Sequence, residues 1–191
     1  MLAIEQIQQL LPNLEQCSQR LKLRLFGPQD EAFEVKQQQD PQVMKYIRPP
    51  LTLEQAQAFF EKVLTPWSAQ EGEWLGLAVE RISDGVTIGG VSFRFESIDF
   101  EIAEIGYRFD ASYQGQGYGT EAVKLLVDWL FTQVKVHKIV AKCDPDNNAS
   151  YRIMEKLNMQ KEALLREHYK MGDIYTDELI CGLLAREYQA D

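Results

Sequence analysis

A glycine-rich segment between an expected strand and an expected helix is the part of this chain best suited to chemistry. Residues 114–120 read Gln-Gly-Gln-Gly-Tyr-Gly-Thr and precede a long amphipathic run. Glycine adopts positive φ angles freely and has no side chain that would hold a ligand away from the backbone. The first N–H groups of a helix lack partners within the helix, and the helix dipole adds partial positive charge there. The segment therefore predicts an anion site suited to a phosphate or pyrophosphate.

The spacing of these glycines excludes two common nucleotide motifs. The segment reads G-x-G-x-G, whereas a dinucleotide fingerprint reads G-x-G-x-x-G and is followed by an acidic residue further on. A P-loop is excluded because Lys-Ser/Thr does not follow the last glycine. Two interpretations stay open: a pyrophosphate held mainly by backbone amides, or a glycine-rich connection that binds no ligand.

A second candidate segment resembles a calcium loop but departs from it. Asp144, Asp146 and Asn148 follow the spacing of the first loop ligands. Ala149, however, replaces the glycine that the sharp turn needs, and the preceding run is typical of a strand rather than a helix. We therefore expect no metal, and interpret these residues as a strand end and helix caps.

The cysteines and histidines do not predict thiol or metal chemistry. Cys17, Cys143 and Cys181 lie far apart without a C-x-x-C pair, which is typical of reduced thiols in a cytoplasmic protein. His137 and His168 are too isolated in the sequence to indicate a metal site or a nucleophile–base pair.

Composition predicts a soluble protein. The 191 residues suffice for a hydrophobic core, and 45% hydrophobic with 26% charged residues is ordinary for a globular chain. The net charge of −9 argues against a nucleic-acid partner, which would require a basic face. No apolar run approaches the roughly 18 residues of a membrane span. Glu5, Glu15 and the lack of arginine before Arg20 argue against a targeting peptide. We expect a cytoplasmic protein with no membrane partner.

The elements that must position the glycine segment follow an informative order. Residues 1–18 predict a helical arm interrupted at Pro12, and Thr52 predicts a helix cap. Strands are expected at residues 20–25, 74–81, 86–95, 101–109, 138–143, 159–168 and 174–184, and helices at 32–39, 40–47, after 52, from the glycine segment to 131, and at 149–157.

This order predicts an α+β fold with one mixed sheet and helices on both faces. Antiparallel strands come first, then a strand–helix–strand–helix unit, then a closing antiparallel pair. A doubly wound fold would alternate throughout, so we exclude it. Without a linker, repeat or low-complexity tract, residues 1–191 are expected to form a single domain.

Two motifs in this order carry a family resemblance. The segment Gln114-x-x-Gly117-x-Gly119 is preceded by Glu-Ile-Gly-Tyr, and Asn147-x-x-Ser150 is followed by x-Arg-x-x-Glu-Lys-Leu. With the opening Arg-Leu-Lys-Leu-Arg, they resemble the GNAT superfamily of acyl-CoA-dependent N-acetyltransferases, most closely its RimJ/RimL-like branch. The resemblance covers roughly residues 20–184.

The resemblance implies a GNAT fold, one mostly antiparallel mixed sheet of about seven strands, with acetyl-CoA as co-substrate and no metal. One splayed strand would pair with the pantetheine arm, and the glycine segment would take the pyrophosphate. The implied cofactor-binding residues are Ile105, Gly106, Tyr107, Arg108, Gln114, Gly115, Gln116, Gly117, Tyr118, Gly119, Thr120, Asn147 and Ser150. Two departures stand out: Gln114 replaces an arginine and so brings no fixed charge, and Asn158-Met159 replaces Gly-Phe.

Transfer of an acetyl group to an amine needs a base for the amine. An α-amino group has a pKa near 8, so a modest base suffices. Glu104, at the start of the cofactor strand, is the first candidate, and an exposed strand carboxylate is the alternative, because alternation does not say which face it takes. Glu96, Asp99 and Glu101 are weaker candidates.

The departing thiolate needs a proton. Met154 stands where many family members have a tyrosine that acts as the general acid. The resemblance therefore implies Ser150 as the proton donor. A hydroxyl in the first turn of a helix is the alternative role for Ser150. We expect direct transfer without an acyl-enzyme.

Taken together, the sequence predicts an acetyl-CoA-dependent N-acetyltransferase acting on a protein N-terminal α-amine or a small-molecule amine. A non-catalytic acyl-CoA sensor or scaffold is the alternative. Residues 39–67 and 169–175 are expected to line the acceptor site, whereas Tyr46, Trp67 and Trp74 are expected mainly in packing roles. Monomer and homodimer both stay open.

Overall fold

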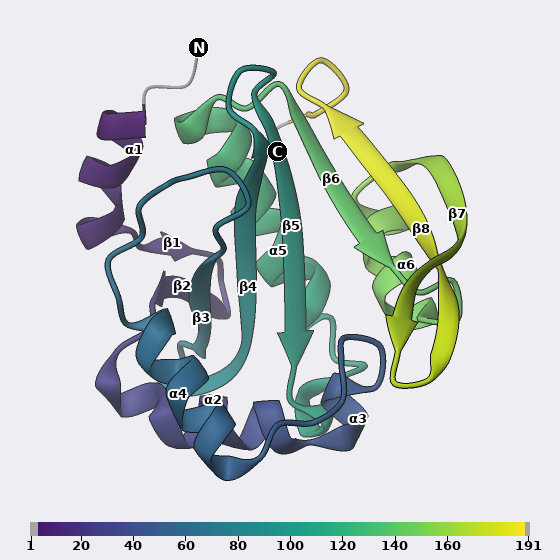
Figure 1. Cartoon of the computed structure of the whole chain (residues 1–191). Helices are drawn as coiled ribbons and strands as arrows, with labels where there is room; N and C mark the ends of the chain where they lie inside the picture. The colour runs from purple at the N-terminus through teal and green to yellow at the C-terminus, as the bar shows by residue number, and fades with distance from the viewer. Residues whose placement is uncertain (1–3, 190–191) are drawn as a thin grey trace.

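An eight-stranded sheet runs through the computed structural model, which describes residues 4–189 (Figure 1). The strand order is β1-β2-β3-β4-β5-β6-β8-β7, and all neighbours are antiparallel except β5 and β6. The strands are β1 (Gln16–Cys17), β2 (Leu21–Leu25), β3 (Leu75–Arg81), β4 (Val86–Ser97), β5 (Ile102–Phe109), β6 (Lys138–Cys143), β7 (Gln160–Met171) and β8 (Ile174–Leu184). The predicted mostly antiparallel mixed sheet is confirmed, with eight strands rather than about seven.

The additional strand, β1, lies in the segment expected to be a helical arm. The helical part is short: α1 (Ile4–Leu10) and the 3₁₀ turn η1 (Leu11–Asn13). The chain then becomes extended at Leu14, and Gln16 and Cys17 pair with β2. The prediction of a helical arm to residue 18 was therefore wrong at its end, because the chain adds to the sheet edge after Pro12. Residues 1–3 of that arm lie outside the described residues.

Helices lie on both faces of the sheet, as predicted (Figure 1). Behind it in this view are α5 (Tyr118–Trp129) and α6 (Asn148–Lys156), while α4 (Leu53–Val63) lies in front, with α2 (Glu31–Gln39) and α3 (Pro41–Met44) at the lower edge. The 3₁₀ turns η2 (Pro28–Asp30) and η3 (Ala111–Tyr113) precede α2 and α5, and the π-helical segment η4 (Leu130–Val134) continues α5. The predicted cap of α4 is confirmed, because Thr52 and Gln55 form a reciprocal capping box.

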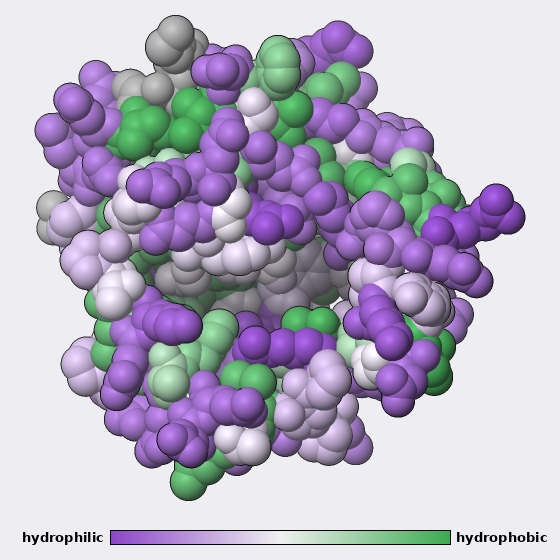
Figure 2. Space-filling view, in the orientation of Figure 1, coloured by the Kyte–Doolittle hydropathy of each residue, from purple (hydrophilic) through white to green (hydrophobic). Residues whose placement is uncertain are grey.

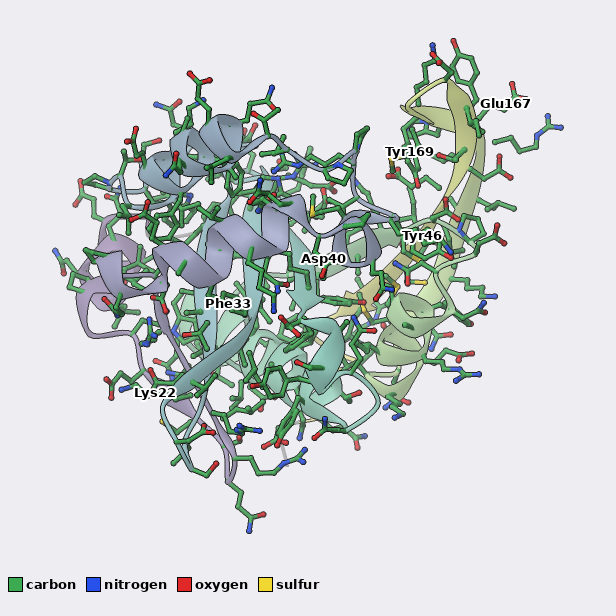
Figure 3. The ribbon with its side chains drawn as sticks, turned by 90° about the horizontal axis from the view of Figure 1, so that it is seen from below. Lys22, Phe33, Asp40, Tyr46, Glu167 and Tyr169 are labelled. Carbon is green, nitrogen blue, oxygen red and sulfur yellow. The ribbon has the colours of Figure 1, made fainter. Side chains whose placement is uncertain are left out.

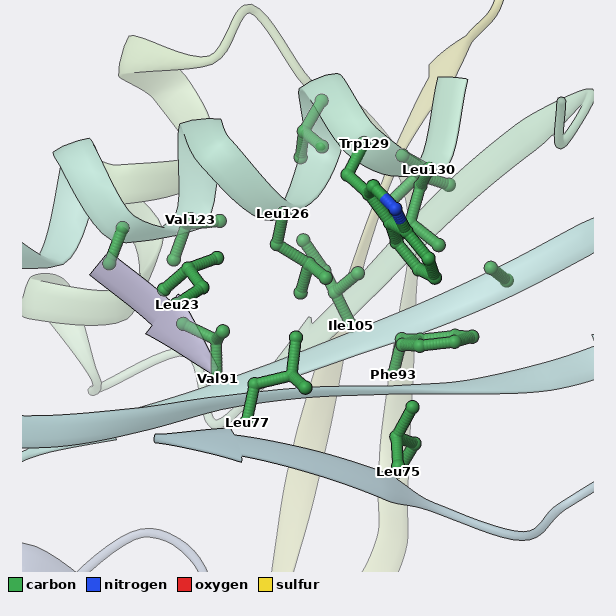
Figure 4. Close-up of a cluster of buried hydrophobic side chains, with 14 of the residues drawn as sticks. Leu23, Leu75, Leu77, Val91, Phe93, Ile105, Val123, Leu126, Trp129 and Leu130 are labelled. Atoms are coloured by element: carbon green, nitrogen blue, oxygen red, sulfur yellow. The ribbon is translucent and has the colours of Figure 1, made fainter. Parts of the chain in front are cut away.

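The hydrophobic core fills the space between the sheet and α5 (Figure 4). Leu126 and Trp129 of α5 meet Phe93 of β4 and Ile105 of β5, and each is at most 3% exposed. The Trp129 and Phe93 rings meet edge to face, with centroids 5.6 Å apart. Burying each such side chain contributes roughly 1.5–3 kcal/mol to folding. This packing fixes α5, and with it the glycine segment that precedes α5, against the sheet.

β5 shapes the site because it loses one neighbour partway along. It pairs with β4 from Ile102 to Phe109, but with β6 only from Ile102 to Ile105. Beyond that point β5 and β6 diverge, as Figure 1 shows, so that the edge of β5 at residues 106–109 lies outside the sheet pairing. A free strand edge offers alternating N–H and C=O groups to an extended ligand.

Candidate active site

The glycine segment forms a turn that only glycine fits easily. Gly115 and Gly117 have φ values of 74° and 82°, and Gly117 is the N-cap of α5. Gly119 has a different reason: a Cβ there would lie 2.9 Å from Ile153 Cδ1, so its absence lets α5 approach α6. The loop thus presents backbone groups at the N-terminus of a helix of 12 residues, beside the free edge of β5.

An arginine from a distant strand supplies a charge beside this loop. Arg20, directly before β2, donates from Nη1 to Gln116 O at 3.2 Å and from Nε to Glu121 Oε2 at 2.7 Å. Its guanidinium lies 4.5 Å from the centre of the Tyr118 ring. Gln114 instead ties the loop back to β5, with its side-chain amide donating to Phe109 O at 3.1 Å. No local pattern connects Arg20 with this loop, because Arg20 lies 96 residues before Gln116.

Asp110 fixes the chain between β5 and the glycine loop. It caps η3 by accepting hydrogen bonds from Ser112 N at 3.0 Å and Ser112 Oγ at 2.6 Å. It also accepts from Lys36 Nζ at 2.7 Å and Gln37 Nε2 at 3.1 Å, both on α2. The hydrogen bond from Lys36, with those from Ser112, lowers the pKa of Asp110 to about 2. Sequence reasoning missed this residue, although an Asp two residues before a serine is a common turn cap.

On the side of α6, the structure brings Ser150 and Tyr107 together. The Tyr107 hydroxyl lies 2.9 Å from Ser150 Oγ and donates to Ser150 O at 3.1 Å. Asn147 is the N-cap of α6, and its side chain accepts from Ser150 N at 3.2 Å. Burial raises the pKa of Tyr107, and burial also raises the pKa of Cys143, next to Ser150, to about 11. Tyr107 and Cys143 are therefore protonated at neutral pH. The hydroxyl of Tyr107 is a feature that the sequence analysis missed, having considered only its backbone.

Glu104 lies on the opposite face of the sheet from α5. It is 7% exposed and accepts from Arg94 Nη2 at 2.6 Å, from Arg94 Nε at 3.0 Å and from Lys142 Nζ at 3.1 Å. Lys142 also pairs with Glu96. The expected alternative, an exposed strand carboxylate, does not describe Glu104. Because side chains alternate along a strand, Glu104 and Tyr107 lie on opposite faces of β5.

Two of the three weaker base candidates, Asp99 and Glu101, lie at the turn between β4 and β5. Asp99 is exposed, and Glu101 has a φ of 56° while its carbonyl accepts from His137 N at 2.8 Å. Neither is brought to the free edge of β5, which begins at Gly106.

The face that carries Glu104 is hollowed in its centre (Figure 2). At Gly106 a Cβ would lie 3.0 Å from Ser92 Oγ and 3.5 Å from Trp74, so the lack of a side chain lets Ser92 and Trp74 pack against this part of β5. Trp74 is 42% exposed and lies under Arg94, whereas Trp67 is buried against Phe93, as expected for a packing role.

The closing hairpin and α3 flank this face on one side. Seen from below, Tyr46 lies at the end of α3 and Tyr169 on the hairpin (Figure 3). The Tyr169 hydroxyl donates to Asp144 Oδ2 at 3.3 Å. The pKa of Lys45 is raised mainly by its hydrogen bond to Tyr46, and the negative charges of Asp146 and Asp144 raise it further. The segments expected to line the acceptor site are thus neighbours across the end of β6.

The described residues, 4–189, contain no cluster of His, Cys, Asp or Glu that could hold a metal ion. No helix among them is long and apolar enough to cross a membrane.

Comparisons with known proteins agree on one family. The family profile described as acetyltransferase (GNAT) domain matches residues 20–160. The uncharacterized N-acetyltransferase p20 of Bacillus licheniformis is 30% identical over 173 residues, which cover 90% of this chain and 96% of that protein. A GNAT-family acetyltransferase structure from Bacillus anthracis has a TM-score of 0.81 at 28% identity, covering 91% of this chain and all of that one. Mycobacterium smegmatis RimJ, solved in complex with CoA-disulfide, shares the fold with a TM-score of 0.75 at 21% identity, covering 87% and 83% of the chains.

Proposed function

The chain belongs to the GNAT family of N-acetyltransferases, and from this premise we propose that it transfers the acetyl group of acetyl-CoA directly to a primary amine. The acceptor is a protein N-terminal α-amine or a small-molecule amine. The observation that carries the proposal is the free edge of β5 at residues 106–109, which leads directly to the glycine loop at the start of α5.

The shape of this region fits CoA, which combines amide groups with a pyrophosphate. Amide groups of an extended ligand can pair with the free edge of β5, as a further strand would. The pyrophosphate fits the turn at Gly115 and Gly117, where two positive φ angles open the backbone before α5. Arg20 neutralises Glu121 in the first turn of α5, so that this carboxylate does not repel the phosphates. Mycobacterium RimJ, which shares this fold, was solved with a CoA derivative.

The amine approaches the thioester from the face that carries Glu104. α5 and α6 cover the other face, whereas this one is hollowed in its centre (Figures 1 and 2). Attack forms a C–N bond and breaks the C–S bond, so the amine nitrogen loses a proton and the sulfur gains one. Glu104, which accepts hydrogen bonds from Arg94 and Lys142, takes the amine proton through a water molecule.

Ser150 delivers a proton to the departing sulfur on the other side of β5. Its hydroxyl is hydrogen-bonded to the protonated Tyr107, which returns a proton to Ser150 and regains its own from water. This pair takes the place of the tyrosine that Met154 replaces, since Met154 is 1% exposed and packs in the core. The base and the acid therefore lie on opposite faces of the strand, as an attack on one side and a departure on the other require.

The experiment is an assay of CoA release from acetyl-CoA across a panel of primary amines, including peptides with free N-termini. The proposal predicts amine-dependent release with an N-acetylated product. Tight binding of acetyl-CoA without turnover of any amine would contradict it and favour the sensor.

A further inference from the structure

Where β5 ends, on the face that carries Glu104, four polar side chains come together from three parts of the chain. They are Glu34 and Gln38 of α2, Arg48 between α3 and α4, and Arg108 of β5, and we call them the arginine cluster. Glu34 Oε1 accepts from Arg108 Nη2 and, at 2.8 Å, from Gln38 Nε2. Gln38 Oε1 in turn accepts from Arg48 Nη2. The cluster is continuous, but its charges do not balance.

Two guanidinium groups in the cluster share one carboxylate. Glu34 is 1% exposed and pairs with Arg108, whereas Arg48 makes no ion pair with a carboxylate in the described residues. The pKa of Arg48 is lowered, mainly by burial and to a smaller extent by the positive charge of the neighbouring Arg108. The Nε atoms of both arginines and Glu34 Oε2 are buried and have no hydrogen-bond partner among residues 4–189. A partly buried, uncompensated charge of this kind is costly unless a counter-ion binds.

A structural tie between α2 and β5 does not explain the second arginine. Glu34 and Arg108 alone would join the helix to the strand. Arg48, stacked on Phe59 with its guanidinium 4.9 Å from the ring centre, adds a second positive charge beside the single carboxylate of Glu34. The net charge of the cluster is one positive unit, which matches a monoanion such as a carboxylate.

The cluster lies close to the place where the acceptor amine must approach. Gly106 and Arg108 lie on the same face of β5 because side chains alternate along a strand, and two residues span roughly 7 Å. Both arginines are partly exposed, and Arg108 shares its face of β5 with Glu104. An anionic group bound there would lie a few bonds from an amine held beside Gly106.

From this arrangement we infer that the amine acceptor carries a carboxylate close to its amino group, and that Arg48 and Arg108 bind it. The inference rests on the proposed function and specifies its substrate class. Guanidinium groups bind carboxylates in a two-pronged geometry. The carboxylate can belong to a small amino acid or to an acidic side chain next to a protein N-terminus.

The test compares kcat/KM for matched acceptors that differ only in the anion. One pair is Ser-Asp-Ala-amide and Ser-Asn-Ala-amide, and the other is 4-aminobutyrate and butylamine. We expect the acidic member of at least one pair to be preferred roughly tenfold or more, mainly through KM. A preference in the peptide pair indicates a protein N-terminus, and one in the other pair indicates a small amino acid.

Arg48→Gln and Arg108→Gln should each abolish this preference, while Arg186→Gln, an exposed arginine near the C-terminus, should keep it. Arg48→Gln leaves the ion pair between Arg108 and Glu34 in place, so this variant remains informative if Arg108→Gln is unstable. Equal kcat/KM within both pairs, or a preference that survives Arg48→Gln, would overturn the inference and leave the proposed function standing. Failure of the wild-type protein to bind acetyl-CoA, measured separately by calorimetry, would overturn both.

Discussion

The hydroxyl pair of Ser150 and Tyr107 carries the acid half of the proposed chemistry. Their oxygens are 2.9 Å apart, and Tyr107 is protonated at neutral pH because burial raises its pKa. A thiol of CoA type has a pKa of about 8.5, so the thiolate is already a fair leaving group and the acid contributes only part of the rate.

Ser150→Ala is expected to lower kcat roughly tenfold with little change in the KM for acetyl-CoA, because the proton donor acts only in the transition state. Tyr107→Phe should lower kcat less, since Ser150 keeps its hydroxyl. Steady-state kinetics over a range of pH check both, with Tyr151→Phe as the neighbouring control. An unaltered pH–rate profile in Ser150→Ala would count against the assignment.

The lowered pKa of Asp110 should make the stability of the fold fall in acid. Its pKa of about 2 in the folded protein lies below the ordinary value of 3.8, because it accepts hydrogen bonds from Lys36 and Ser112. The stabilisation is therefore complete above pH 3.8 and is lost as the pH falls towards 2. Asp110→Asn should lower the free energy of unfolding by about 1–2 kcal/mol at neutral pH, a modest figure because Lys36 is 65% exposed.

Urea unfolding of the wild-type protein and Asp110→Asn between pH 7 and the lowest pH at which both fold measures this difference. The gap between the two should narrow on acidification. A gap that is constant with pH would show that the carboxylate charge is not what stabilises the turn.

At the scale of elements, the loop before α5 is held in place by Arg20, the residue directly before β2. Glu121, in the first turn of α5, places a negative charge beside the proposed phosphate site, and Arg20 neutralises it. Arg20 also holds the carbonyl of Gln116, which orders the turn. The free edge of β5 and the α5 terminus thus depend on a contact between distant segments.

Arg20→Ala should raise the KM for acetyl-CoA roughly five- to tenfold, because Glu121 would then repel the phosphates. Glu121→Ala should leave this KM unchanged or lower it, and the double variant should recover most of the loss. Measuring the KM of all three in one double-mutant cycle gives the coupling. Additive effects would contradict the role assigned to Arg20.

Gly117→Glu is expected to abolish acetyl-CoA binding while leaving the fold intact, because its side chain would occupy the turn and its charge would repel the phosphates. Gly172→Glu is the matched control, since Gly172 also has a positive φ and open space around it, on the β7–β8 hairpin. Calorimetry checks the affinities. Wild-type affinity in Gly117→Glu would rule out the loop as the phosphate site.

At the scale of the whole molecule, the sequence predicted what depends on local pattern. The strand at 138–143, the Thr52 cap and the closing hairpin around Gly172 follow from periodicity and turn residues, and all are found. The two-residue strand β1 could not be predicted, because only its pairing with β2 makes it a strand.

The same limit applies to the site. The glycine loop and Ser150 stand in motifs, but Arg20 and Arg48 act across the fold, on groups that no local pattern connects to them. The face taken by Glu104 was also open until the registers of β4 and β5 were known, since a shift by one residue would reverse it. Residues that stand in motifs were therefore predictable, whereas the charged residues that reach the site from distant segments were not.

The central claim is that this chain catalyses acetyl transfer from CoA to an amine at the gap between β5 and β6. The most direct measurement follows CoA release and N-acetylated product in the same sample, with an accepted primary amine, for the wild-type protein and Gly117→Glu. We expect equal amounts of CoA and acetylated amine from the wild-type protein and none above background from the variant. CoA release without acetylated amine, or equal turnover by Gly117→Glu, would contradict it.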